Sequence, residues 1–198
     1  MNKESIVVDM KNCPQTQNQS VYDHGISVNQ YFWNLHSILT NGDDSSEWRI
    51  PSWLSAHKDR IVENLLSAEI INDYTIFHDC GKPYCRTVDE DGRQHFPYHA
   101  QVSHDTWLEM SEDMQVARLI LFDMDIHLMK NDDVPIFCAK TTLEEACTLL
   151  LVSLSELHSN ASMFGKEGTK STSFKIKFKQ IEKRGKAICK TLFEGDKK

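Results

Sequence analysis

The sequence lacks the features that mark several classes of protein. Its 198 residues contain no apolar run close to the roughly 20 residues that a membrane-spanning helix needs. The first twenty residues have no apolar segment followed by a small-residue cleavage site, so no secretory signal is predicted and we expect a cytoplasmic protein with no membrane partner. Repeats and low-complexity tracts are missing too. A hydrophobic content of 40% predicts one domain, residues 1–198, with one ordinary core.

Cysteine is present, but its spacing excludes the usual cysteine-based scaffolds. The six cysteines are scattered without a CxxC pair. A disulfide framework would also need an oxidising compartment, for which the sequence gives no sign. Cys138 and Cys147 have apolar neighbours and are typical of small core residues. We therefore expect neither a disulfide framework nor a zinc–thiolate site.

An excess of positive charge is also missing, since the net charge is −7. This argues against a protein that coats nucleic acid with its whole surface. Nine Lys and Arg residues nevertheless lie between Lys166 and Lys190, against only Glu167 and Glu182. The basic C-terminal segment, residues 166–198, is expected either to attract a phosphorylated substrate or to form a solvated helix face, and the sequence leaves both open.

Apolar periodicity predicts an all-α protein, a compact helical bundle. The first twenty residues are polar and are predicted to be flexible. Helices are expected over 21–39, 55–66, 68–80, 100–110, 114–129, 146–161 and 172–193, the sixth with its start near Thr142. The helix at 146–161 is apolar on nearly all sides and is predicted to be central and buried. Segments 41–53, 81–99 and 130–140 are predicted loops, and no strand pair is expected.

The stretch YTIFHDCGKP carries the chemistry. It places His78 and Asp79 side by side near the end of a predicted helix, with Lys82 close behind. Upstream, YDHGISV places His24 at the start of another helix. Imidazole and carboxylate together suit a divalent metal, and helical bundles gather such ligands from separate helices. The pattern predicts a metal site that forms only in the tertiary structure.

These residues resemble the HD-domain superfamily of metal-dependent phosphohydrolases, whose signature is a His, then a His-Asp pair, then a distant Asp. The chain is most similar to the HD domain attached to bacterial CCA-adding tRNA nucleotidyltransferases. Their pattern of HDxGKP, an acidic turn, DGR, HF and a two-residue step to His resembles HDCGKPYCRTVDEDGRQHFPYH here. The likeness is specific over about 77–104 and weaker back to His24 and forward to about Asn160. The Gly-Ser and paired aspartates of a nucleotidyltransferase core are missing, so the resemblance implies hydrolysis.

The resemblance also implies roles for single residues. His24, His78 and Asp79 would be metal ligands, and Glu156 stands where the family has its last ligand, an Asp. Asp125 is the alternative final ligand if the similarity slips after His104.

Further residues would contact substrate or take part in catalysis. Asp79 could double as general base, while Lys82 and His99 would offset charge on the phosphate. His104 and Asp123 are the remaining candidates for substrate binding, and Asp123 replaces a family histidine. Roles outside any functional site also stay open for these residues. His99 could be an ordinary loop residue, His104 and His127 could be surface groups, and Glu156 could pair with a core Lys or Arg.

The resemblance thus implies an HD-type enzyme that hydrolyses a phosphate ester of a nucleotide or an RNA end with a metal-activated water. The cofactor would be Mn, Co, Ni or Mg, and the partner a phosphorylated small molecule, a nucleotide or an RNA end. The alternative is a catalytically degenerate HD fold that binds a nucleotide or a partner. The sequence does not choose the metal, the substrate or the oligomeric state.

Overall fold

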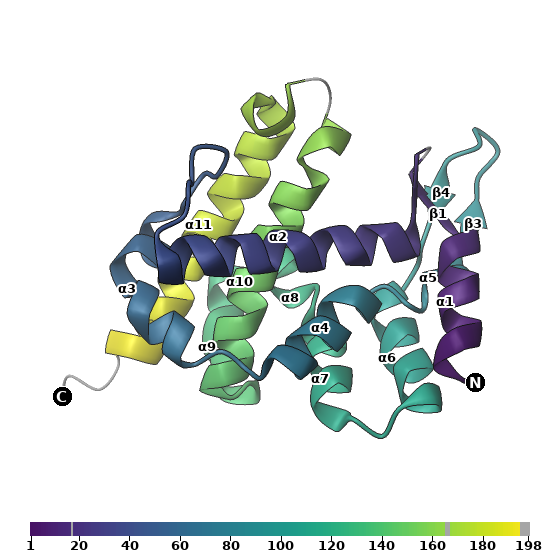
Figure 1. Cartoon of the computed structure of the whole chain (residues 1–198), viewed down its shortest axis with the longest axis horizontal. Coiled ribbons are helices and arrows are strands. Elements are labelled where there is room, and N and C mark those ends of the chain that lie inside the picture. The colour runs from purple at the N-terminus through teal and green to yellow at the C-terminus, as the bar shows by residue number, and fades with distance from the viewer. Residues whose placement is uncertain (17, 165–166, 195–198) are drawn as a thin grey trace. The chain divides into compact units, whose positions relative to one another are not determined.

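Helices make up most of the computed structural model, which describes residues 1–16, 18–164 and 167–194 (Figure 1). The prediction of an all-α protein is confirmed. The chain divides into two compact units, and each unit combines two separate stretches of sequence. The first comprises Met1–Asn29 and Ala68–Met124, and the second Gln30–Ser67 and Asp125–Lys198. The long helix α2 (Val21–Asn41) begins in the first and ends in the second. The single HD-type domain over 1–198 stays a prediction.

The first unit is built mainly from helices. They are α1 (Lys3–Asn12), the start of α2, α4 (Ala68–Phe77), α5 (Lys82–Cys85), α6 (His99–Met110) and α7 (Met114–Phe122). Helix α6 packs against α7, and α7 against α4. Trp107 of α6 and Phe77 of α4 are buried together, with ring centroids 5.6 Å apart. This packing fixes the end of α4, where His78 and Asp79 follow.

The first twenty residues include a helix that the sequence did not predict. They were expected to be flexible, but α1 begins after Asn2, which caps it by accepting a hydrogen bond from the Ser5 N–H at 2.8 Å. Ile6 and Met10 of α1 are fully buried. Two apolar residues four positions apart lie on one face of a helix, so even this polar segment has a side to pack.

Two short antiparallel hairpins also correct the expectation of no strand pair. Strand β1 (Pro14–Thr16) pairs with β2 (Gln19–Ser20), and β3 (Thr87–Val88) pairs with β4 (Gln94–His95). The second hairpin turns at Gly92, whose φ of +78° suits glycine. Such strands are too short for the alternation that identifies strands in a sequence.

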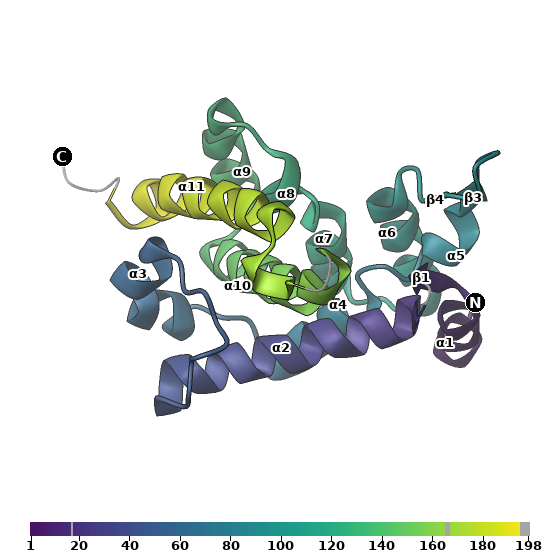
Figure 2. The same cartoon turned by 90° about the horizontal axis from the view of Figure 1, so that it is seen from above.

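The second unit is arranged around α11 (Thr172–Glu194), which packs against several helices (Figure 2). These are α3 (Ser52–Glu63), α8 (Asp125–Leu128), α9 (Val134–Lys140) and α10 (Leu143–Ser159). The unit also holds the 3-10 helices η1 (Asn131–Asp133), η2 (Asn160–Phe164) and η3 (Gly168–Lys170).

The long helices of this unit agree with the sequence. Helix α10 starts at Thr142, whose hydroxyl accepts from the Glu145 N–H at 3.2 Å in a capping box, and its residues are buried on nearly all sides. Phe174 and Ile188 of α11 are buried. Helix α9 was predicted to be a loop, but Pro135 stands in its first turn, where proline is tolerated.

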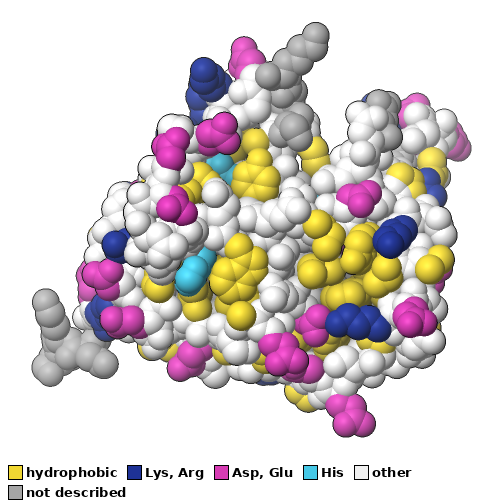
Figure 3. All heavy atoms as spheres, in the orientation of Figure 1, with side chains coloured by type: hydrophobic (Ala, Val, Ile, Leu, Met, Phe, Trp, Pro, Cys, Tyr) yellow, Lys and Arg dark blue, Asp and Glu magenta, His cyan; other side chains and the backbone are white. Residues whose placement is uncertain are grey.

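The surface agrees with the composition. Figure 3 shows acidic side chains spread over the visible face, with fewer Lys and Arg. Lys175, Lys177 and Lys179 of the basic C-terminal segment are exposed, whereas Lys166 lies outside the described residues. Among the described helices, none has the length and apolarity needed to cross a membrane. All six cysteines are free thiols.

Candidate metal centre

His78 and Asp79 lie in the tight turn that joins α4 to α5 in the first unit. Helix α4 ends at Phe77, whose carbonyl oxygen accepts from the Cys80 N–H at 2.9 Å. The Asp79 carbonyl oxygen accepts from the Lys82 N–H, also at 2.9 Å. The pair therefore comes at the end of a helix, as the sequence predicts, and is held by a hydrogen-bonded turn.

Two glycines let neighbouring segments come close to this turn. A Cβ added at Gly25 would lie 2.2 Å from the Ile76 carbonyl oxygen, so α2 touches the backbone of α4 beside His24. A Cβ added at Gly81 would lie 2.3 Å from the Ser103 backbone nitrogen. These contacts hold α2, α4 and α6 together within the first unit. They explain how residues far apart in the sequence converge on Asp79.

Three imidazoles surround the carboxylate of Asp79. The Nε2 atoms of His24 and His78 lie 3.8 and 3.3 Å from its Oδ2. On the other oxygen, Nε2 of His99 lies 3.8 Å from Oδ1. The rings of His24 and His78 meet edge to face with centroids 5.2 Å apart. The structure thus brings together the predicted His, the His-Asp pair and the later His.

Backbone carbonyls orient two of these imidazoles. Nδ1 of His78 is 2.8 Å from the Thr75 carbonyl oxygen, and Nδ1 of His99 is 3.1 Å from the Phe96 carbonyl oxygen. A carbonyl only accepts, so Nδ1 donates in each contact, and Nε2 is the nitrogen that faces Asp79 and would face an ion. Metal-binding histidines are oriented in this way in proteins, with one nitrogen donating to a second group and the other facing the ion.

Lys82 is the counterion of Asp79. Its Nζ lies 2.5 Å from Asp79 Oδ2 and donates a second hydrogen bond to Gln15 Oε1 at 3.0 Å. Burial by itself would raise the pKa of the Asp79 carboxyl. The Lys82 ammonium and the imidazoles of His78 and His24 outweigh burial and hold that pKa well below its usual value. Asp79 is therefore a charged carboxylate at neutral pH.

The other predicted residues of the first unit have partners of their own. Asp123 is buried at the end of α7 and accepts a hydrogen bond from the Tyr74 hydroxyl at 2.6 Å. Nδ1 of His104, on α6, lies 2.8 Å from Asp105 on the same helix. The predicted roles of Asp123 and His104 in substrate binding stay predictions.

Glu156 and Asp125 belong to the second unit. Glu156, on α10, lies 3.0 Å from Nε2 of His127 and accepts from the Asn160 amide at 3.4 Å. The sequence left a metal or a core Lys or Arg as the partner of Glu156. The contact with His127 is an addition to these alternatives, and metal binding by Glu156 stays a prediction. Asp125 opens α8, where its carbonyl oxygen accepts from the Met129 N–H. Which of the two is the last metal ligand stays a prediction.

Sequence reasoning missed the groups that support the centre. The Thr75 carbonyl could have been inferred, because it lies one helical turn before His78 at the end of α4. Gln15 has no local signal, since it is 67 residues from Lys82 in the chain. The bond from Tyr74 to Asp123 is also a tertiary contact that the pattern does not reveal.

No known protein is found with which this geometry can be compared. Scans of protein-family models, of curated proteins and of solved structures each return no match to the chain. The likeness to HD domains therefore rests on the residues quoted above.

Proposed function

We propose that this chain is a metal-dependent phosphohydrolase whose centre is formed by His24, His78, Asp79 and His99. One observation carries the proposal: three imidazole Nε2 atoms lie within 3.8 Å of one buried, charged carboxylate. Burying a carboxylate is unfavourable unless it is paired or binds a metal. Gathering three histidines around it goes beyond what one Lys82 ion pair needs.

The donor set fits a divalent transition ion better than a hard oxygen-seeking one. Imidazole nitrogens favour Mn, Co and Ni over Mg, which is usually held by oxygen ligands and water. Such an ion, when bound, supplies Lewis-acid activation of a phosphate ester and of water at neutral pH. We accordingly expect activity to be supported by Mn, Co or Ni more than by Mg.

The side chains divide the remaining tasks. A carboxyl with a strongly lowered pKa is a weak base, so Asp79 serves better as ligand than as general base. His99 is the most accessible of the three imidazoles, with its side chain 22% exposed, and would contact substrate. Lys82 neutralises Asp79 and adds positive charge where a phosphate would bind. The substrate class is a phosphate ester of a nucleotide or an RNA end.

One observation favours the alternative of a degenerate HD fold that binds without catalysis. Lys82 already supplies Asp79 with a positive charge, so the pair could be stable with no metal. The two functions differ in turnover. A binding module holds nucleotide but releases no phosphate.

The test is a screen of the purified chain, stripped with EDTA and then supplied with Mn, Co, Ni or Mg. Substrates are cyclic nucleotides, 2′- and 3′-phosphates, 5′-monophosphates and triphosphates. The proposal expects metal-dependent phosphate release from at least one substrate, abolished by EDTA. Stoichiometric metal without any turnover would favour the binding module.

The variants Glu156→Gln and Asp125→Asn, compared by metal content, identify the last ligand. We expect the larger loss of metal in Glu156→Gln.

A further inference from the structure

The second unit contains a pocket that the proposed function does not use. It is an open pocket of about 1080 Å³, and all of its described lining residues belong to that unit. Its walls come from α2, from the loop between α2 and α3, from the end of α10 and from η3. A pocket of this size accommodates a small organic molecule.

His158, at the end of α10, is a buried polar group in the wall of this pocket. It is 2% exposed, and its ring packs between Trp48 and Phe174 with centroids 4.3 and 5.1 Å away. One ring nitrogen is hydrogen-bonded to the backbone of Arg49. The other, Nε2, is buried and has no hydrogen-bond partner among the described residues. Leaving a buried polar atom unsatisfied is unfavourable, so a partner atom from a ligand would be stabilising.

The direction of that missing hydrogen bond follows from the bond to Arg49. A backbone carbonyl can only accept, so the nitrogen facing Arg49 carries the imidazole proton and Nε2 is an acceptor. The ligand must therefore offer a donor, such as an N–H group.

Aromatic side chains define the shape of the ligand. Tyr31 and Trp48 line the same pocket with centroids 5.8 Å apart and ring planes inclined at 62°. Trp48 is fixed by donating its indole N–H to Asn34 Oδ1 at 2.7 Å, while Tyr31 is 37% exposed. Rings anchored in this way offer apolar faces on which a flat ring can stack.

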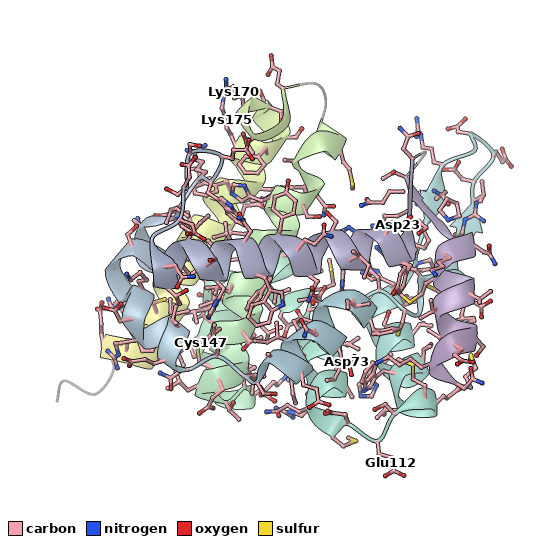
Figure 4. All side chains as sticks on the ribbon, in the orientation of Figure 1. Asp23, Asp73, Glu112, Cys147, Lys170 and Lys175 are labelled. Carbon is pink, nitrogen blue, oxygen red and sulfur yellow. The ribbon has the colours of Figure 1, made fainter. Side chains whose placement is uncertain are left out.

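The charges at the pocket favour an uncharged ligand. Among the described residues, the charged side chains in its lining are Glu47, Glu167 and Lys170, all of them exposed. Two carboxylates against one ammonium do not favour a phosphate. Figure 4 labels Lys170, which is in η3, and Lys175, which is near the start of α11. Gln30 adds an amide, which can donate to and accept from the edge of a neutral ring.

We propose that this pocket binds an uncharged, planar heteroaromatic ring that carries an amino group, as an aminopurine nucleoside does. The amino group donates to Nε2 of His158, and the ring stacks on Tyr31 and Trp48. The inference is independent of the metal centre, because none of the proposed histidine and Asp79 ligands lines the pocket.

The experiment titrates the full chain in EDTA by calorimetry, so that no metal-dependent turnover occurs. The probes are adenosine, purine riboside, which lacks only the amino group, and adenosine 5′-monophosphate. We expect saturable binding of adenosine, binding of purine riboside weaker by about 10-fold, and no tighter binding of the monophosphate. Absence of adenosine binding, equal binding of purine riboside, or tighter binding of the monophosphate overturns the proposal.

Variants locate the binding. His158→Phe keeps a ring but removes the acceptor. It should weaken the binding of adenosine about 10-fold, so that adenosine and purine riboside bind with equal affinity. His57→Phe, a histidine of the same unit outside the pocket, is the matched control and should bind as the wild type does. Tyr31→Leu, at a partly exposed position, should also weaken the binding of adenosine, and this variant tests the pocket if His158→Phe does not fold. If Tyr31→Leu binds adenosine with wild-type affinity, the ligand does not bind in this pocket. Asp79→Asn should leave adenosine binding unchanged, which separates this test from that of the metal centre.

Discussion

At the scale of residues, Asp79 joins the chemistry of the candidate centre to the stability of the fold. It is buried, charged, paired with Lys82 and approached by His24, His78 and His99. Breaking a buried ion pair by removing one partner typically costs about 3–5 kcal/mol, because the remaining charge is left uncompensated. A bound divalent ion would supply such compensation.

Lys82→Met should therefore lower the melting temperature in EDTA by roughly 6 °C or more, at about 2–4 °C per kcal/mol for a chain of this size. Adding Mn should raise the melting temperature of the variant more than that of the wild type, because the ion replaces the missing charge. Both are read from thermal unfolding curves. Lys3→Met is the control, since the Lys3–Asp73 pair is exposed and weak. Equal shifts on adding Mn to both proteins would mean that Lys82 and the ion do not share Asp79.

At the scale of elements, the centre depends on how closely α2 approaches the end of α4. Glycine inside a helix is usually replaced by alanine with a gain of about 1 kcal/mol in helix stability. At Gly25 the added Cβ would lie 2.2 Å from the Ile76 carbonyl oxygen, so the two segments must separate.

We expect Gly25→Ala to lower the free energy of unfolding by about 1–3 kcal/mol, as overpacking does, and to lower metal content because His24 moves with α2. Urea unfolding and metal analysis of the purified variant measure the two effects. Gln30→Ala, at an exposed position of the same helix, should change neither. A more stable Gly25→Ala with full metal content would show that the close approach is unimportant.

The basic face of α11 is the second element with an expected effect. Exposed charges act over about 8 Å at physiological salt, so Lys175, Lys177 and Lys179 can steer a charged substrate but not alter chemistry at a distance. Replacing all three with Gln should raise the KM for a highly charged substrate, less so at high salt. Turnover of a small phosphodiester should stay nearly unchanged. An equal response of both substrates, or of neither, would mean that this is only a solvated helix face.

The sequence predicts those elements whose signals are local. Helix α10 has an apolar run and a capping residue at Thr142, and α2 has a clear apolar stripe. Helix α1 was missed because its burial depends on only Ile6 and Met10, and α9 because Pro135 looked like a loop signal. At the site, the adjacent pair His78 and Asp79 could be identified as candidate ligands from the sequence. The bond from Lys82 to Gln15 and the pocket around His158 arise only when distant segments meet.

At the scale of the whole molecule, the acid stability of the folded chain should reflect His158. Burial lowers the pKa of His158 from about 6.5 to about 4, an effect that its hydrogen bond to the Arg49 backbone opposes only in part. The fold therefore prefers the neutral imidazole. The stability linked to this preference is complete above pH 6.5 and is lost as the pH falls towards 4.

Between pH 7 and pH 4.5 this linkage should remove roughly 2–3 kcal/mol from the free energy of unfolding. His158→Phe should lose less over the same interval, by about that amount, in urea titrations at the two pH values without ligand. Equal acid sensitivity in His158→Phe and wild type would show that His158 is not held neutral by the fold.

The most direct test of the central claim is the metal content of Asp79→Asn. Asparagine keeps the shape of the side chain but removes the charge that a cation needs, while circular dichroism checks that the helices remain. After loading with Mn and gel filtration, we predict about one ion per wild-type chain and nearly none in Asp79→Asn, with phosphoesterase activity lost in parallel. Asp73→Asn, at a half-buried aspartate of α4 outside the centre, should match the wild type. Wild-type metal content in a folded Asp79→Asn variant would contradict the assignment of this cluster as a metal centre.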